Sequence, residues 1–201
     1  MRHTSFTFSV TELSQLFRAW FAIALAFGIL LNGGFALTPK FFFLVVVAAF
    51  TVGLGFLLHE LAHKAVAVRY GCWAEFRSFD SMLVLAVLMS FFGFILAAPG
   101  AVFIQGRVSV SRNGLISAVG PLTNLFLGIV FLLLSFVLSG SLGIIAFYGL
   151  MINSWLAIFN LLPILGLDGT KVFRWNKLVY FSMLVFAFGM LGLSYFLNNN
   201  V

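Results

Sequence analysis

Long apolar runs separated by short polar turns dominate the chain. Because about 20 residues of helix cross the hydrocarbon core of a bilayer, runs of this length predict membrane spans. The five clearest runs are 17–37, 41–68, 115–138, 142–163 and 178–197. Turn residues fall between them, as at Asn32-Gly33-Gly34 and Ser139-Gly140-Ser141. A sixth run at 82–104 is ambiguous, so the pattern predicts an all-α polytopic membrane protein with five to six transmembrane helices.

The positions of Lys and Arg decide how the ambiguous run is interpreted, because cytoplasmic loops collect basic residues. If every run crosses the membrane from a cytoplasmic N-terminus, most basic residues fall on the outside. If 82–112 instead enters and returns on the same side, only Lys40 stays outside. We therefore expect a cytoplasmic N-terminus and a re-entrant segment.

The re-entrant segment has a predicted internal order. The sequence indicates a helix over 82–98, a break at Pro99-Gly100 and short strands within 102–110, which gives a short re-entrant β element near 99–112. Non-helical backbone at membrane depth is tolerated only where protein or water surrounds it. Such backbone suits a cleft that holds an extended peptide.

Composition excludes several classes of protein. Hydrophobic residues make up 63% of the 201 residues and charged residues 8%, which leaves no room for a separate soluble domain. We expect one integral membrane domain over 1–201. The net charge of +6 comes from basic residues between apolar runs, which is typical of orientation signals, so nucleic acid is not an expected partner. Cys72 stands alone and forms neither a disulfide nor a Cys-based metal site.

Three ionisable side chains that can bind a metal or activate water lie within five residues of one another inside the run at 41–68. They belong to the stretch His59-Glu60-Leu61-Ala62-His63. Ionisable groups in hydrocarbon are costly unless paired or ligated, so they indicate a functional site. Histidines at i and i+4 share one helix face and can bind one zinc ion, while Glu60 faces the metal-bound water. The alternative is a pair of histidines satisfied by hydrogen bonds between helices.

Water must reach this site from one side of the membrane. Arg69 anchors the end of the span at the cytoplasmic surface, and His59 lies about 15 Å deeper at the rise of a helix. A zinc ion there needs a water path from the cytoplasmic face. Lys64 is expected to snorkel toward that face, with lining of the water path as the alternative.

Asp168 is the candidate third ligand. It is the only acidic residue after Asp80, and Pro163 and Gly166 before it should end the run at 142–163. Two His and one Asp leave a fourth position for water, as catalytic zinc requires. The alternative is a capping or surface aspartate that pairs with Lys171.

With these residues the chain resembles the site-2 protease family of intramembrane zinc metalloproteases. Three motifs follow one another in the family's order: His59 to His63, Gly120-Pro121-Leu122-Thr123-Asn124, and Asn160-Leu161-Leu162-Pro163 leading to Leu167-Asp168-Gly169. The resemblance implies a core from 41 to 170.

The resemblance also implies roles. His59, His63 and Asp168 would bind one Zn²⁺, and Glu60 would be the catalytic acid and base. Asn160 would hydrogen-bond the substrate backbone or the developing oxyanion. For Asn124 the same role and a helix-packing amide remain open.

The implied activity is that of a zinc endopeptidase in the cell membrane. It would hydrolyse peptide bonds within or near transmembrane segments of protein substrates, by Glu-assisted attack of zinc-bound water. Two alternatives use the same residues: a metal transporter or sensor, and a relative that binds transmembrane helices without cutting them. Transport is disfavoured because no other His or acid lies inside a firm span, and a non-cleaving relative because Glu60 and every ligand are present.

Overall fold

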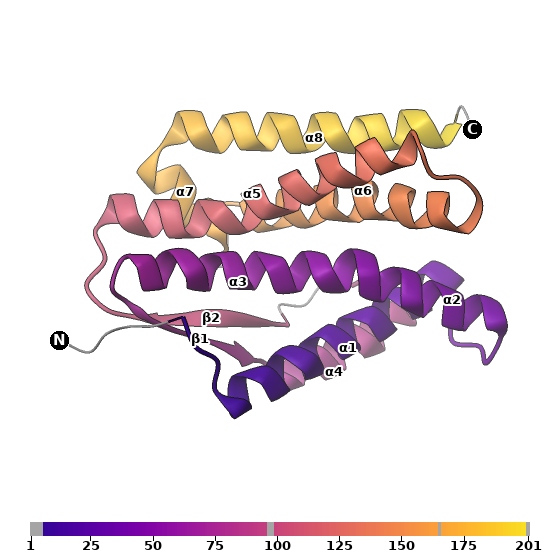
Figure 1. Ribbon diagram of the computed structural model, residues 1–201, viewed down its shortest axis with the longest axis horizontal. Coiled ribbons are helices and arrows are strands. Elements are labelled where there is room, and N and C mark those ends of the chain that lie inside the picture. The colour runs from indigo at the N-terminus through magenta and orange to yellow at the C-terminus, as the bar shows by residue number, and fades with distance from the viewer. Residues whose placement is uncertain (1–5, 96–98, 165, 200–201) are drawn as a thin grey trace.

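The computed structural model describes residues 6–95, 99–164 and 166–199, which form helices stacked over a small sheet (Figure 1). The motif helix α3 runs through the middle, with α5 and α6 above it and α8 outermost, while the sheet, α1 and α4 lie on its other side. In chain order the elements are α1 (Val10–Asn32), α2 (Pro39–Ala48), the π-helical turn η1 (Ala49–Gly53), α3 (Leu54–Arg69), β1 (Trp73–Ser78), α4 (Asp80–Ser90), β2 (Gly100–Gln105), α5 (Val110–Ser135), α6 (Gly140–Leu161), α7 (Asp168–Trp175) and α8 (Lys177–Asn199).

Among the described residues, five helical stretches are long and apolar enough to cross a membrane: α1, the continuous α2–α3 rod, α5, α6 and α8. This confirms the predicted class. The first helix begins at Val10, seven residues before the predicted start, because the Ser9 side chain accepts a hydrogen bond from the Glu12 N–H and caps it. It ends at Asn32, where Gly33 adopts a left-handed conformation with φ of 74°.

The ambiguous run forms a short helix. α4 has 11 residues and is therefore about 16 Å long, roughly half of the hydrocarbon thickness. The expected helix over 82–98 is too long, since α4 ends at Ser90 and the chain turns at Gly93, whose φ is 85°. The rest of that expectation, 96–98, lies outside the described residues.

A strand follows, as predicted, but its partner was not foreseen. β2 pairs antiparallel with β1, and Phe76 lies opposite Val102. The expected strands over 102–110 are confirmed only to Gln105, because Ser109 caps the start of α5. Alternation in β1 puts Ala74 and Phe76 in the interior.

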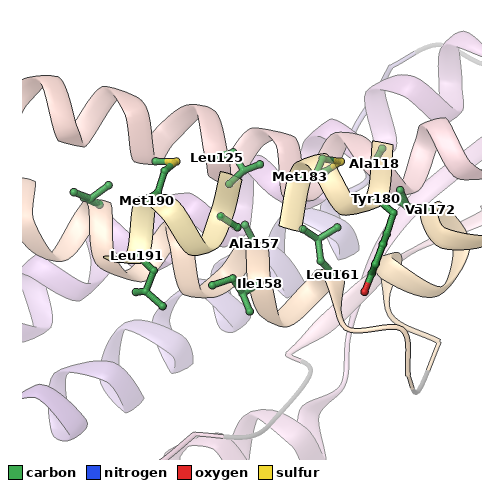
Figure 2. Close-up of a cluster of buried hydrophobic side chains, with 12 residues drawn as sticks. Ala118, Leu125, Ala157, Ile158, Leu161, Val172, Tyr180, Met183, Met190 and Leu191 are labelled. Atoms are coloured by element: carbon green, nitrogen blue, oxygen red, sulfur yellow. The ribbon is translucent and has the colours of Figure 1, made fainter. Parts of the chain in front are cut away.

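A buried apolar cluster joins α5, α6, α7 and α8 (Figure 2). Its members include Leu125 of α5, Leu161 of α6 and Val172 of α7, with Tyr180 and Met183 contributed by α8. Close-packed side chains of this kind resist displacement. The cluster therefore holds the end of α6 and the whole of α7 against α5, which fixes the position from which Asp168 projects.

Lys64 neither snorkels nor lines a water path, so both expectations for it are wrong. The residue is 1% exposed, and its ammonium contacts the N-terminal segment. The ammonium pairs with the Glu12 carboxylate at 2.5 Å, donates to the Thr7 carbonyl at 2.7 Å, and lies 4.4 Å from the centre of the Phe8 ring. A buried charge needs such partners, and Glu12, far away in sequence, supplies the opposite charge.

Candidate metal centre

Three predicted ligands meet at one point between α3 and α7. Nε2 of His59 and Nε2 of His63 lie 3.0 Å apart, and Oδ2 of Asp168 lies 3.2 Å and 3.0 Å from them. Ligand atoms about 2 Å from a zinc ion stand roughly 3.3 Å apart in a tetrahedral site. The spacing of the three donors therefore fits a zinc ion.

The ring nitrogens that face away from this point each have a hydrogen-bond partner, which shows where each histidine carries a hydrogen. Nδ1 of His59 lies 2.6 Å from Oδ1 of Asn124, and Nδ1 of His63 lies 2.6 Å from the carbonyl oxygen of Ile116. Both partners are acceptors, so each Nδ1 carries a hydrogen and each Nε2 is the nitrogen available to a metal ion. Two Nε2 atoms and a carboxylate oxygen thus converge on one point, an arrangement suited to a metal cation.

Two residues of the stretch from Gly120 to Asn124 on α5, the first and the last, lie against the two histidines. A Cβ built on Gly120 would collide with Nε2 of both histidines, so only glycine leaves that space open. Pro121 lies inside the helix, which bends along its length (Figure 1). Asn124 is fully buried and bonds His59.

Asp168 is the first residue of α7 and approaches the histidines because the backbone of α7 lies directly against the end of α6. A Cβ on Gly169 would collide with the carbonyl oxygen of Leu161. Burial alone would raise the pKa of the Asp168 carboxyl, but His63 and His59 beside it outweigh that effect and hold the pKa below its ordinary value. The carboxyl is therefore ionised.

The alternative partner of Asp168 is also present. The Lys171 ammonium lies 3.9 Å from Oδ1 of Asp168, and the lysine side chain is 42% exposed. An exposed pair at this distance contributes little. The other carboxylate oxygen faces the two imidazoles, so the interpretation of Asp168 as a metal ligand is better supported than that of a surface aspartate.

Glu60 lines the same cavity as the three ligands. The cavity has a volume of about 860 Å³ and is mostly apolar, with walls from α1, α3, α4, α5, α6, α7 and β2. Glu60 is buried, and its Oε2 accepts a hydrogen bond of 3.1 Å from the backbone N–H of Val102 on β2. The sheet therefore orients the carboxylate beside the metal site.

The two candidate asparagines differ in position. Asn160 lines the same cavity as Asp168, and its Nδ2 donates to the Leu156 carbonyl at 3.0 Å. Asn124 donates from Nδ2 to the Gly55 carbonyl and to Oδ1 of Asn153. Both hydrogens of its amide are thus used within the protein, which favours the helix-packing alternative for Asn124 and adds a contact with His59.

Sequence reasoning missed three contributors to the site. The Ile116 carbonyl and the Val102 N–H are backbone groups, and no side-chain pattern could have identified them. Asn153 had a visible signal, because it is an amide inside the apolar run at 142–163, where an unpaired polar group is costly.

Comparison with known proteins identifies a relative that spans most of the chain. No family model matches the chain, and no solved structure matches it. The protein named "Putative zinc metalloprotease MJ0611", from Methanocaldococcus jannaschii, is 39% identical over 180 residues. The matched region covers 87% of this chain and 90% of the relative.

Proposed function

We propose, since the chain belongs to the same family as this zinc metalloprotease, that it is an intramembrane endopeptidase of the site-2 protease type. The observation that carries the proposal is the convergence of two imidazole Nε2 atoms and an ionised carboxylate at the wall of the cavity that also holds Glu60. The α2–α3 rod, which carries His59, Glu60 and His63, is long and apolar enough to cross a bilayer, and Asp168 begins α7 shortly after the spanning helix α6. Its substrates would be transmembrane segments of other proteins.

The residues present divide the reaction between them. Zinc, when bound by His59, His63 and Asp168, supplies a Lewis acid that makes water nucleophilic at neutral pH and polarises the peptide carbonyl. The Glu60 carboxylate accepts a proton from the attacking water and passes it to the leaving nitrogen. One water is thereby added across the peptide bond, which yields a carboxylate and an amine. The Val102 N–H holds Glu60 in place for both proton transfers.

The substrate must lose helical structure before it is cut. In an intact helix each carbonyl accepts a backbone hydrogen bond and is wrapped by side chains. Asn160 is suited to hold the unwound backbone, because its amide uses one N–H for Leu156 and has a second for a substrate carbonyl. The cavity lies between residues of α1, such as Phe27, and residues of α6, such as Trp155, and we infer that the segment enters there.

The orientation of the protein in the membrane is inferred from its basic residues. Arg107 and Arg112 flank the start of α5, and Lys171 and Arg174 lie on α7. The start of α5, α7 and the end of α3 lie at the same end of the protein (Figure 1). Under the positive-inside rule this end faces the cytoplasm. The proposed enzyme therefore lies in the cell membrane and draws its water from the cytoplasmic side.

The decisive test uses the purified full chain in detergent and Glu60→Gln. Zinc is measured by elemental analysis, and cleavage by mass spectrometry on model single-pass peptides with a central Asn-Pro or Gly-Gly pair. We expect zinc at one ion per chain in both proteins, and chelator-sensitive cleavage by the wild type alone. Cleavage by Glu60→Gln at the wild-type rate, or cleavage that survives metal removal, would overturn the proposal. Zinc flux into liposomes by both proteins without cleavage would indicate a transporter instead.

A further inference from the structure

A chain of buried side-chain amides leads from α6 to the metal site. Asn153 on α6 and Asn124 on α5 are both fully buried, and Nδ2 of Asn124 lies 3.1 Å from Oδ1 of Asn153. Oδ1 of Asn124 faces Nδ1 of His59 at 2.6 Å. At the other end, Nδ2 of Asn153 donates to the Gly149 carbonyl at 2.9 Å.

The direction of every hydrogen bond in this chain is fixed by its far end. The Gly149 carbonyl can only accept, so Asn153 must turn its nitrogen toward it and its oxygen toward Asn124. Asn124 then meets two acceptors, Oδ1 of Asn153 and the Gly55 carbonyl, and must turn its nitrogen to them. Its oxygen is left for His59.

This direction decides whether His59 can bind a metal. If the Asn124 amide were reversed, its nitrogen would donate to Nδ1 of His59, and a neutral ring would then carry its hydrogen on Nε2. A protonated Nε2 cannot be a ligand. His63 has no such dependence, because its Nδ1 faces the backbone carbonyl of Ile116, which cannot reverse.

The packing around Asn153 is consistent with a fixed amide. A Cβ built on Gly55 would come within 2.5 Å of Oδ1 of Asn153, so glycine at this position allows α3 and α6 to approach closely. The same approach brings the Gly55 carbonyl within 3.2 Å of Asn124.

We propose that Asn153 is a positioning residue for the zinc site: it holds the Asn124 amide in the direction that leaves Nε2 of His59 free for the metal. The inference rests on the proposed zinc site. A residue that only packed helices together would affect folding but not zinc affinity in the folded protein.

The test measures the zinc dissociation constant of the purified chain by competition with a chromophoric chelator, beside the thermal unfolding of the metal-free protein. Outer partners of metal ligands change metal affinity by 10–100-fold, and Asn153 acts one step further out, so Asn153→Leu should weaken zinc binding by about 10-fold. Asn153→Asp has the same shape, and as a buried neutral acid it still accepts from Asn124 and donates to Gly149, so it should stay close to wild type.

Ser154→Ala is the matched control. Ser154 is also fully buried on α6 and bonds the carbonyl four residues earlier, Leu150, but it has no part in the amide chain. Its removal should leave zinc affinity unchanged. If Asn153→Leu does not fold, Asn153→Ala replaces it in the comparison with Asn153→Asp.

A double substitution separates positioning from packing. In Asn124→Asp both side-chain oxygens accept, so His59 keeps its hydrogen on Nδ1 in either orientation and Asn153 is no longer needed. Asn153→Leu should therefore cause no further loss of zinc affinity in that background. Equal loss in both backgrounds, or wild-type affinity in folded Asn153→Leu, would overturn the inference. A wild-type protein that binds no zinc would instead refute the proposed function.

Discussion

Phe76 and Val102 face each other across the two-stranded sheet, and the backbone N–H of each donates to a different buried glutamate. The Phe76 N–H donates to Oε1 of Glu12 at 2.9 Å, and the Val102 N–H donates to Oε2 of Glu60 at 3.1 Å. The sheet is therefore held between α1 and α3 by one carboxylate at each edge. Because Glu12 also binds Lys64, which follows His63 on α3, the N-terminal segment sets the position of the sheet beside Glu60.

The first prediction concerns Glu12→Gln. The carboxylate serves two donors with two oxygens, whereas the amide has one oxygen and no charge, so the Lys64 ammonium loses its counter-charge and either it or the Phe76 N–H loses its acceptor on residue 12. Loss of one partner of a buried ion pair costs about 3–5 kcal/mol. We expect lower thermal stability and slower cleavage at unchanged zinc content. Asp80→Asn, which breaks the exposed pair with Arg18, is the control and should cost less than about 1 kcal/mol.

The second prediction is that Lys64→Met rescues Glu12→Gln. In the double variant the side-chain oxygen of the introduced glutamine accepts from the Phe76 N–H, and no buried ammonium is left without its counter-charge. Thermal unfolding should show the double variant to be more stable than Glu12→Gln alone. If the two losses simply add, the ion pair is not what holds the N-terminal segment to α3.

The third prediction is that Asp168→Asn loses the stabilisation that zinc gives. An amide in place of the carboxylate removes the ligand charge, so zinc at 100 times the wild-type dissociation constant, which should stabilise the wild type by about 2.7 kcal/mol, should not stabilise the variant. Without metal the variant also lacks the attraction between the Asp168 carboxylate and the imidazoles 3.2 Å and 3.0 Å away, so metal-free Asp168→Asn should unfold at a lower temperature than the metal-free wild type. Thermal unfolding with and without zinc checks both statements. Stabilisation of the variant by zinc equal to that of the wild type would contradict the assignment of Asp168 as a ligand.

The sequence predicted the parts of this site that depend on local geometry. The spacing of His59 and His63 places both rings on one helix face, and Pro163 limits α6, which ends at Leu161. Asp168 lies over 100 residues away, and its place beside them was implied by the order of motifs in a known family. The packing of α7 against α5 and α6 brings it there, and that packing has no signature at Asp168 itself.

The missed features depend on contacts between distant segments. Lys64 and Glu12 are each ordinary at their positions in the sequence, and only the return of the N-terminal segment along α3 brings them together. β1 was overlooked because its six residues include two charges and follow directly on an apolar span. The alternation of apolar and charged residues in β1 was visible in the sequence, but its partner, β2, lies beyond α4.

The fourth prediction is that Gly120→Ala abolishes zinc binding in a protein that still folds. The added methyl group would collide with Nε2 of His59 and of His63, which is the space the metal needs. Alanine favours a helix over glycine by about 1 kcal/mol, so α5 itself should not be weakened. The matched control is Gly189→Ala on α8, where a Cβ meets nothing within 4 Å among the described residues. We expect elemental analysis to find wild-type zinc in Gly189→Ala and none in Gly120→Ala, with helical circular dichroism preserved in both. If Gly120→Ala retained zinc at wild-type affinity, the metal would have to lie away from the three converging atoms, and the assignment of the site would be wrong.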